Sequence, residues 1–533
     1  MKRAAGILLP VFSLPSAGGI GALGPAAYRW VDFLAAAGQS WWQVLPLGPT
    51  GYGDSPYQSF SAFAGNPYFI DPALLAREGL LTAEECAAAH CGSEDAVDYG
   101  ALYQKRFVLL RTAFSRFTDT AALAAFRAQN AHWLEDYALY TALKTENSQK
   151  SWLEWPAEYR LRRPGALAEA RRRLAREMEF CIFQQYEFAR QWAALRAYAQ
   201  QKSVGIIGDM PIYVALDSAD VWAHRELFDL DENGLPNEVA GCPPDAFSAD
   251  GQLWGNPLYR WDILQADGYA WWMERLAAGF ALFDRIRIDH FRGLESYYAI
   301  PYGAPNAKNG RWRPGPGLDF IRAIRSRFGP SGKEGIIAED LGFLTPAVHT
   351  LLRRSGYPGM KVLQFAFDSR EESDYLPHNY TRNCVVYTGT HDNDTLCGWL
   401  QESAPRADVR FARRYLDIHT RRDAHWHFIR AALASVADLA VIPMQDYLGL
   451  GSSARINIPA ALGGNWAWRM RRGSDSAALA GRIAQLTALY GRAPKAAEAR
   501  PKRRTSPPVS NRPASRRGAS KEAIHAVHTA HTE

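Results

Sequence analysis

The chain is poor in cysteine and contains no long apolar run. Its 533 residues include six cysteines, none of them in a Cys-x-x-Cys pair. A chain long enough to bury a full core does not need a disulfide framework, so this composition favours a reduced, cytoplasmic location. No stretch of about 18 uncharged apolar residues occurs, and we therefore expect no membrane span. The His-Glu-x-x-His zinc pattern is also missing, so the sequence implies no metal and no other cofactor.

The net charge of +6 is confined to one end of the chain. Residues 493–533 hold nine Lys/Arg and three Asp/Glu, and the other 492 residues carry 52 charges of each sign. The body therefore gives no reason to expect a nucleic-acid or membrane partner. The segment 493–533 is rich in Pro, Arg, Ser and Ala. We expect it to be a basic, disordered tail, either without function or a tether for an anionic partner.

The first residues of the chain mimic a secretory signal peptide. Lys2 and Arg3 precede an apolar run, but Pro10 interrupts that run. Residues 6–9 fit a first buried strand equally well. We therefore expect a strand at this position and not an export signal.

Eight short apolar runs, rich in β-branched residues, alternate with helical stretches. Runs of this kind are typical of buried strands, and their alternation with helices indicates a parallel sheet. Eight such strands indicate an α/β fold, a closed (β/α)8 TIM barrel. The expected strands are 6–9, 41–47, 204–214, 283–288, 335–338, 360–367, 384–388 and 439–444.

The uneven spacing of these strands places insertions on the barrel rim. The longest, about residues 82–201, is rich in Ala, Arg, Leu and Glu with helical periodicity, and we expect a helical subdomain there. Shorter insertions at about 217–262 and 301–317 contain Pro- and Gly-rich segments and are expected to form loops that shape a site. Residues 1–492 are then a single barrel domain with inserted, mainly helical subdomains on its rim.

Two glycine-rich segments match nucleotide-binding patterns only in part. Residues 19–24 fit the Gly-x-Gly-x-x-Gly fingerprint, but they do not directly follow a strand, and no acidic residue ends a second strand about 20 residues later. We interpret them as a tight turn. Residues 329–333 have the wrong glycine spacing for a phosphate loop, and Glu334 follows the lysine. Neither segment predicts a nucleotide site.

Three acidic residues stand after apolar, β-branched runs. Asp289, Glu339 and Asp392 follow expected strands, and the C-terminal ends of barrel strands open into one mouth. Acids gathered around one sugar bond supply the general acid and the nucleophile that break glycosidic bonds. Arg287 lies two residues before Asp289, so strand alternation points both side chains the same way. Asp209 follows the third strand in the same manner.

The sequence around these acids resembles the α-amylase clan of glycosidases. It resembles most closely the 4-α-glucanotransferases of the amylomaltase and disproportionating-enzyme type, glycoside hydrolase family 77, over about residues 5–492. Apart from the acids, the resemblance is carried by residues 6–9, 13–16, 54–58, 61–67, 208–214 and 254–259. The segment 455–466 fits only loosely, because residues 460–462 intervene where the family has a Pro-Gly turn.

The resemblance implies a role for each matching residue. Asp289 is implied as the nucleophile that forms a covalent glycosyl-enzyme, Glu339 as the general acid and base, and Asp392 as the carboxylate that grips the donor sugar. Tyr57 is implied as the platform beneath that sugar. The implied substrate-binding residues are Tyr57, Ser55, Asp209, Phe247, Trp254, Asn256, Arg287 and His391.

The function implied by the resemblance is transfer of α-1,4-glucan segments from a glucan donor to glucose or a maltooligosaccharide acceptor. A retaining double displacement needs its two carboxyl groups about 5–5.5 Å apart, and neighbouring acids should raise the pKa of Glu339. Transfer also needs water to be kept from the intermediate, for which the aromatic-tipped loop 241–247 is a candidate. Two alternatives stay open: an α-glucan hydrolase with the same carboxylates, and a non-catalytic glucan-binding barrel.

Overall fold

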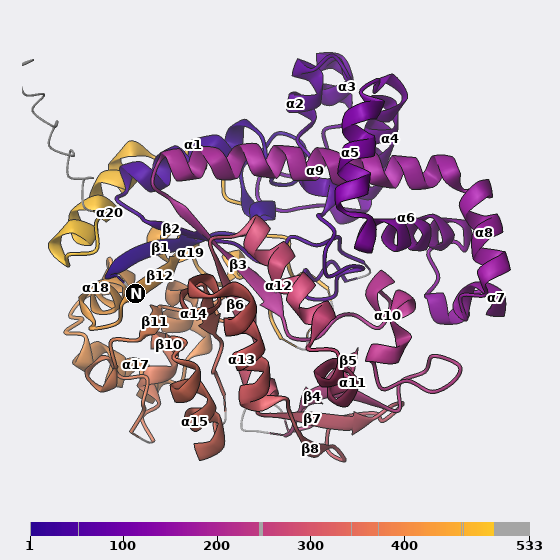
Figure 1. The fold of residues 1–533 in the computed structure, drawn as a ribbon. Helices are drawn as coiled ribbons and strands as arrows, with labels where there is room; N and C mark the ends of the chain where they lie inside the picture. The colour runs from indigo at the N-terminus through magenta and orange to yellow at the C-terminus, as the bar shows by residue number, and fades with distance from the viewer. Residues whose placement is uncertain are drawn as a thin grey trace, which may run out of the picture. The chain divides into compact units, whose positions relative to one another are not determined.

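Eight parallel strands form one sheet that curves round on itself in the computed structural model (Figure 1). Their order around the sheet is β10-β11-β12-β1-β2-β3-β6-β9. The strands are β1 (Ala4–Leu8), β2 (Trp41–Gln43), β3 (Gly205–Pro211), β6 (Arg285–Asp289), β9 (Ile336–Ala338), β10 (Gly359–Val362), β11 (Cys384–Tyr387) and β12 (Leu439–Pro443). Each expected run overlaps one of these strands, with bounds that differ by a few residues, and the (β/α)8 barrel predicted from the sequence is confirmed. The structure describes residues 2–51, 53–244, 249–342, 344–370, 372–459, 461 and 463–494.

The barrel closes between β9 and β10 through a side chain as well as the backbone. The amide of Ala338 donates to the carbonyl of Pro358 at 2.9 Å. The amide of Met360 donates to Oδ1 of Asp340 at 2.6 Å. A Cβ atom at Gly359 would lie 2.5 Å from Oδ2 of Asp340, so the close approach requires glycine there. Asp340 thus supplies an acceptor at the seam where the two end strands of the sheet meet.

Alternate strand residues divide between the inside of the barrel and the surrounding helices. The inner cluster takes every second residue, such as Val385 and Tyr387 on β11. On β6 the inner positions belong instead to Arg285, Arg287 and Asp289, and the outward positions to isoleucine. The barrel interior is therefore apolar on most strands and charged along β6, because the pleat of β6 carries its polar residues to a single face. Asp209 on β3 adds a charge that pairs with Arg287.

Helices cover the outside of the barrel. They include α1 (Pro25–Ala36), α12 (Ala270–Leu282), α13 (Gly317–Phe328), α15 (Pro346–Ser355), α17 (Arg406–Tyr415), α18 (Ala424–Ala434) and α20 (Ala477–Leu489). At Gly279 on α12, a Cβ atom would come within 2.9 Å of Ile286 and Met210, so glycine lets this helix approach β3 and β6. No helix of the described residues is long and apolar enough to span a membrane.

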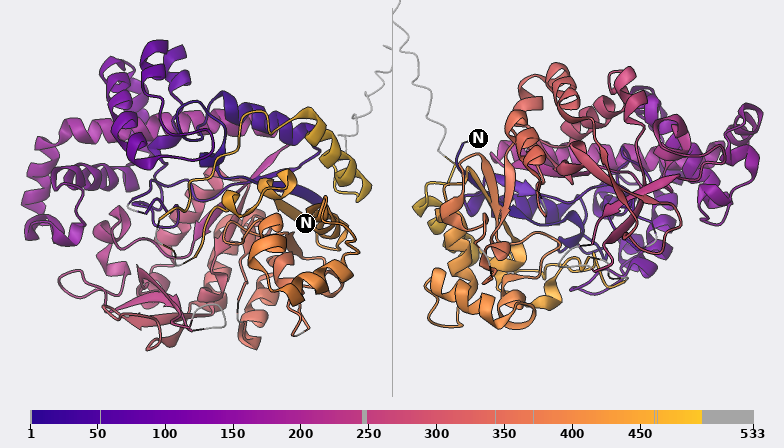
Figure 2. Two further views of the ribbon diagram at one scale, coloured as in Figure 1. Left: turned by 180° about the vertical axis from the view of Figure 1, so that it is seen from behind. Right: turned by 90° about the horizontal axis from the view of Figure 1, so that it is seen from below.

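Two insertions rise from the barrel on the side away from α18 and α20 (Figures 1 and 2). The helices between β2 and β3 include α3 (Ala83–Ala88), α4 (Tyr99–Arg116), α5 (Thr120–Gln129), α6 (Ala131–Glu146), α7 (Ala157–Arg160), α8 (Pro164–Arg173) and α9 (Ala175–Gln201). The second insertion is a four-stranded antiparallel sheet, in the order β5-β4-β7-β8. Its strands are β4 (Glu238–Cys242), β5 (Gln252–Pro257), β7 (Ser296–Pro301) and β8 (Arg311–Pro314).

The antiparallel sheet is not among the strands expected from the sequence. Its strands fall in or beside segments 217–262 and 301–317, which we expected to be loops. They are four to six residues long and contain glycine and proline, so their composition is typical of rim loops. Pairing between β4 and β7, more than 50 residues apart in sequence, decides the structure. The basic tail predicted at 493–533 lies outside the described residues from residue 495 on.

Replacing Asp340 tests the seam. Asp340→Ala should lower the free energy of unfolding by about 1–3 kcal/mol, because the buried amide of Met360 loses its acceptor. Asp340→Asn keeps an acceptor oxygen in the same place and should lose clearly less. Urea denaturation of both variants measures the difference. Equal losses in the two variants would show that the hydrogen bond does not close the barrel.

Candidate active site

One guanidinium group joins two of the predicted acids inside the barrel mouth. Strands β3 and β6 are in register, with Asp209 opposite Arg287. Nη1 of Arg287 contacts Oδ1 and Oδ2 of Asp209 at 2.7 and 2.8 Å, and Nη2 contacts Oδ1 of Asp289 at 2.8 Å. The side chain of Asp209 is fully buried, whereas that of Asp289 is 29% exposed. Asp289 is therefore the carboxylate of this pair that a ligand can reach.

Glu339 follows β9 and lies beside the end of β6. Its backbone amide donates to the carbonyl of Ile288 at 3.0 Å. Its carboxyl oxygens accept hydrogen bonds from the amides of His290 and Leu341, both at 2.7 Å. Burial and the negative charge of Asp289 raise the pKa of Glu339 to about 8, against the opposing effects of Arg287 and the two amides. At neutral pH this carboxyl group holds its proton, as an acid catalyst must.

His290 adopts a backbone conformation that is uncommon for a side-chain-bearing residue. Its φ is +53°, in the left-handed region, and this turn directs its amide to Glu339. Its ring meets the ring of Trp254 edge to face, with centroids 4.8 Å apart. Burial lowers the pKa of His290 to about 4, so the ring is neutral at pH 7. His290 was not among the predicted site residues, although it directly follows Asp289.

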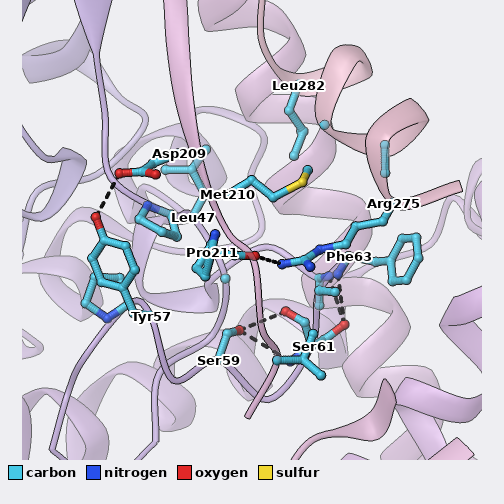
Figure 3. Close-up of a pocket in the computed structure, with 18 of the residues that line it drawn as sticks. Leu47, Tyr57, Ser59, Ser61, Phe63, Asp209, Met210, Pro211, Arg275 and Leu282 are labelled. Atoms are coloured by element: carbon cyan, nitrogen blue, oxygen red, sulfur yellow. Dashed lines mark hydrogen bonds between the residues drawn. The ribbon is translucent and has the colours of Figure 1, made fainter. Parts of the chain in front are cut away.

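Tyr57 links Asp209 to the third acid. Its hydroxyl donates to Oδ2 of Asp209 at 2.8 Å, a bond visible in Figure 3. The same hydroxyl lies 3.5 Å from Nδ1 of His391, and the two rings stack with centroids 5.1 Å apart. Nε2 of His391 is 3.3 Å from Oδ2 of Asp392. Burial and the charge of Asp209 raise the pKa of Tyr57, so its hydroxyl keeps the proton that it donates.

Asp392 is held by two residues that are not among the predicted site residues. Nδ2 of Asn457 donates to Oδ1 of Asp392, and Nη2 of Arg455 donates to its backbone carbonyl, both at 2.6 Å. The side chain of Asp392 is 44% exposed, so its other oxygen stays accessible. The ring of Trp466 packs against the rings of Tyr57 and His391, with centroid distances of 5.8 and 5.9 Å. Arg455, Asn457 and Trp466 all lie in the segment 455–466, which departs from the family pattern.

The remaining predicted binding residues surround this group at different depths. Asn256 is buried and donates to the carbonyl of Val214 at 2.8 Å, so it ties β5 to the segment after β3. Ser55 accepts a hydrogen bond from the amide of Tyr57 at 3.3 Å and supports its turn. Trp254 is half-buried beside His290. Phe247 lies outside the described residues. The described residues contain no cluster of three or more metal-ligating side chains.

A small cavity next to the acids is not the reaction site. It has a volume of about 80 Å³ and extends from Tyr57 and Asp209 past Met210 to Arg275 on α12 (Figure 3). None of the three carboxylates Asp289, Glu339 and Asp392 lines it. The carboxylates instead meet at the open barrel mouth, where two of them are partly exposed. A ligand that uses all three must therefore enter from the mouth.

Comparisons with known proteins agree with this geometry. A family model described as 4-alpha-glucanotransferase matches residues 9–475. The chain is 49% identical over 488 residues to a 4-alpha-glucanotransferase of Thermus thermophilus, covering 89% of this chain and 96% of the relative. It is 43% identical over 486 residues to a 4-alpha-glucanotransferase of Clostridium butyricum, covering 90% and 99%.

Solved structures give the same result. The amylomaltase from Streptococcus agalactiae in complex with acarbose superimposes with a TM-score of 0.89 at 39% identity, covering 92% of this chain and all of that one. The amylomaltase from Corynebacterium glutamicum superimposes with a TM-score of 0.75 at 17% identity, covering 91% and 75%, and supports the fold alone.

Because Asp289 lies beside Glu339, replacing Asp289 should change the pKa of Glu339. In Asp289→Asn the pKa of Glu339 should fall from about 8 toward its ordinary value, because a like charge beside it is removed. Isotope-edited infrared titration of the Glu339 carboxyl, with Glu339→Gln as the blank, measures this. The remote variant Asp262→Asn should leave the pKa where it is. An unchanged pKa in Asp289→Asn would refute the electrostatic coupling.

Proposed function

Since the chain belongs to the 4-alpha-glucanotransferase family, glycoside hydrolase family 77, and has its activity, we propose that Asp289, Glu339 and Asp392 carry out the transfer by a retaining double displacement. The observation that carries this proposal is the contrast between two neighbouring carboxyl groups. Asp289 is partly exposed and bound by Arg287, and beside it Glu339 has a pKa of about 8. The two carboxyl groups thus differ as a nucleophile and an acid must.

The first step transfers the donor sugar to the protein. Glu339 gives its proton to the glycosidic oxygen while a carboxylate oxygen of Asp289 attacks the anomeric carbon. The bond from that carbon to the leaving oxygen breaks, and a bond to Asp289 forms. The contact with Arg287 orients the Asp289 carboxylate during the attack.

The second step delivers the sugar to the acceptor. An acceptor hydroxyl loses its proton to the Glu339 carboxylate, and its oxygen attacks the anomeric carbon. The bond to Asp289 breaks, and the configuration of the original linkage is restored. Glu339 is protonated again and both carboxyl groups have returned to their starting state.

The remaining polar residues hold the donor sugar. Oδ2 of Asp392 and Nε2 of His391, which lie 3.3 Å apart, bind hydroxyl groups of the sugar. The ring of Tyr57, braced by His391 and Trp466, offers a flat face beneath the sugar. Since these contacts strengthen as the ring flattens toward its oxocarbenium state, they favour the transition state.

We infer that the acceptor is glucose or a maltooligosaccharide. The S. agalactiae amylomaltase was solved with acarbose, which supports an oligosaccharide site in this fold. Trp254 on β5 packs against His290, which brings the antiparallel sheet beside the reacting acids. An acceptor glucan lying against this sheet would displace water from the intermediate, which favours transfer over hydrolysis.

We also propose a cytoplasmic location. The buried cysteines Cys91, Cys181 and Cys384 form no disulfide. Burial raises the pKa of Cys181 and Cys384 to about 12, so these thiols are inert side chains of the core. A chain that keeps its cysteines in this form suits a reducing compartment.

Maltotriose separates transfer from hydrolysis. The protein should convert maltotriose to glucose and a series of longer maltooligosaccharides. Chromatography of the products measures this conversion. Asp289→Asn should reduce this turnover by about four orders of magnitude, because the covalent intermediate no longer forms. Asp284→Asn changes an acid at the opposite end of β6, paired with Arg196, and serves as the control. A gain of reducing ends without longer chains would favour the hydrolase.

The hydrogen bond from Asn457 to Asp392 leads to a second kinetic prediction. Asn457→Ala should lower kcat roughly 10- to 100-fold on maltotriose, since it removes a hydrogen bond to a charged group worth about 1.5–3 kcal/mol. Asn465→Ala is the matched control, because among the described residues Asn465 forms side-chain hydrogen bonds within its own segment, to Ile458 and Ala461. A kcat loss as large in Asn465→Ala would mean that the segment, and not its bond to Asp392, matters.

A further inference from the structure

A second cavity lies in the antiparallel-sheet insertion. Its volume is about 290 Å³, at the lower end of the range for small-molecule sites. Tyr297 on β7 and Arg313 on β8 form one wall, and Arg260 with Asp262, at the start of α11 (Trp261–Ala266), form another. Figure 1 shows α11 beside this sheet, at the bottom of the view. The cavity shares no lining residue with the first cavity, and none of the three carboxylates lines it.

The charges around this cavity balance and are already paired. Nε and Nη2 of Arg260 donate to the two oxygens of Asp262 at 3.0 and 2.8 Å. Arg313 forms an ion pair with Glu238, and Asp229 accepts a hydrogen bond from Asn237 at 2.8 Å. Paired charged groups offer a ligand both hydrogen-bond donors and acceptors, and together they carry little net charge. They suit a neutral ligand with many hydroxyl groups better than an anion or a cation.

Aromatic side chains complete the cavity and make it rigid. Trp261 is half-exposed and stacks on the buried Trp272 with centroids 6.2 Å apart. It also packs on Tyr259 at 5.0 Å, and the Tyr259 hydroxyl donates to the carbonyl of Ile212 at 2.9 Å, just beyond β3. Tyr297 is 8% exposed, and burial raises the pKa of its hydroxyl, which therefore stays protonated. An indole braced in this way offers a fixed apolar surface to a sugar ring.

We propose that this cavity is a second binding site for α-glucan chains, separate from the catalytic mouth. The proposal rests on the action of the protein on α-1,4-glucans, which are neutral and carry hydroxyl groups along their whole length. A chain held in the cavity and in the mouth at once gains avidity without any new contact at the acids. A substrate too short to reach both places gains nothing from the second one. The site should therefore matter for polymers and not for maltotriose.

Affinity electrophoresis in gels containing glycogen tests the site. The parent is Asp289→Asn, which does not process the polymer. Adding Arg260→Gln and Tyr297→Phe to this parent should weaken retention at least fivefold, because both groups that face the ligand lose polar atoms. The matched control is Arg116→Gln, which breaks an exposed two-pronged ion pair with Glu85 at a distant helix and should leave retention unchanged.

Two measurements keep the outcome clear. The melting temperature shows that the variants are folded, and Asp262→Asn, whose side chain is 65% exposed, gives a second variant that does not disturb the core. With Asp289 intact, Arg260→Gln/Tyr297→Phe should convert maltotriose within twofold of the unmodified protein. Equal glycogen retention in folded cavity variants and parent would overturn the second site. Failure of the unmodified protein to make longer maltooligosaccharides from maltotriose would instead overturn the proposed function, whatever the gels show.

Discussion

The contact of Arg287 with both Asp209 and Asp289 is the interaction on which the site depends. Its side chain is 4% exposed, inside a barrel whose interior is apolar on most other strands. A charge in that place is stable only when it is paired, and removal of one partner of a buried pair costs about 3–5 kcal/mol. The register of β3 and β6 supplies the partners, so the fold and the charge arrangement support each other.

The properties of the other site residues follow from this contact. Asp289 is fixed beside Glu339, and its charge helps to raise the pKa of Glu339 to about 8. Asp209 accepts the hydroxyl of Tyr57, which in turn stacks on His391 next to Asp392. A single network thus runs from the buried guanidinium to the exposed third acid. Its members come from four segments that are far apart in the chain, and the barrel mouth brings them together.

The insertions add to the barrel what the acids alone do not supply. The antiparallel sheet reaches the site through Trp254, which meets the ring of His290. The same sheet contains the second cavity, with Tyr297 and Arg313 on its neighbouring strands. The barrel therefore carries the three carboxylates, and the sheet carries the cavity that we propose as a site for a long glucan. An enzyme that passes chains between acceptors benefits from such a surface, because a tethered chain stays close to the mouth.

The sequence by itself determined the barrel strands and the three acids, because both are local features. An apolar run buries itself wherever it lies, and an acid after such a run arrives at the strand end. Only the tertiary structure decided the second sheet, the left-handed turn at His290 and the bond from Asn457 to Asp392, 65 residues away in the chain. These features depend on partners that are distant in sequence. Barrel closure brings these partners together, and no local sequence pattern predicts which polar groups will form a hydrogen bond with each other.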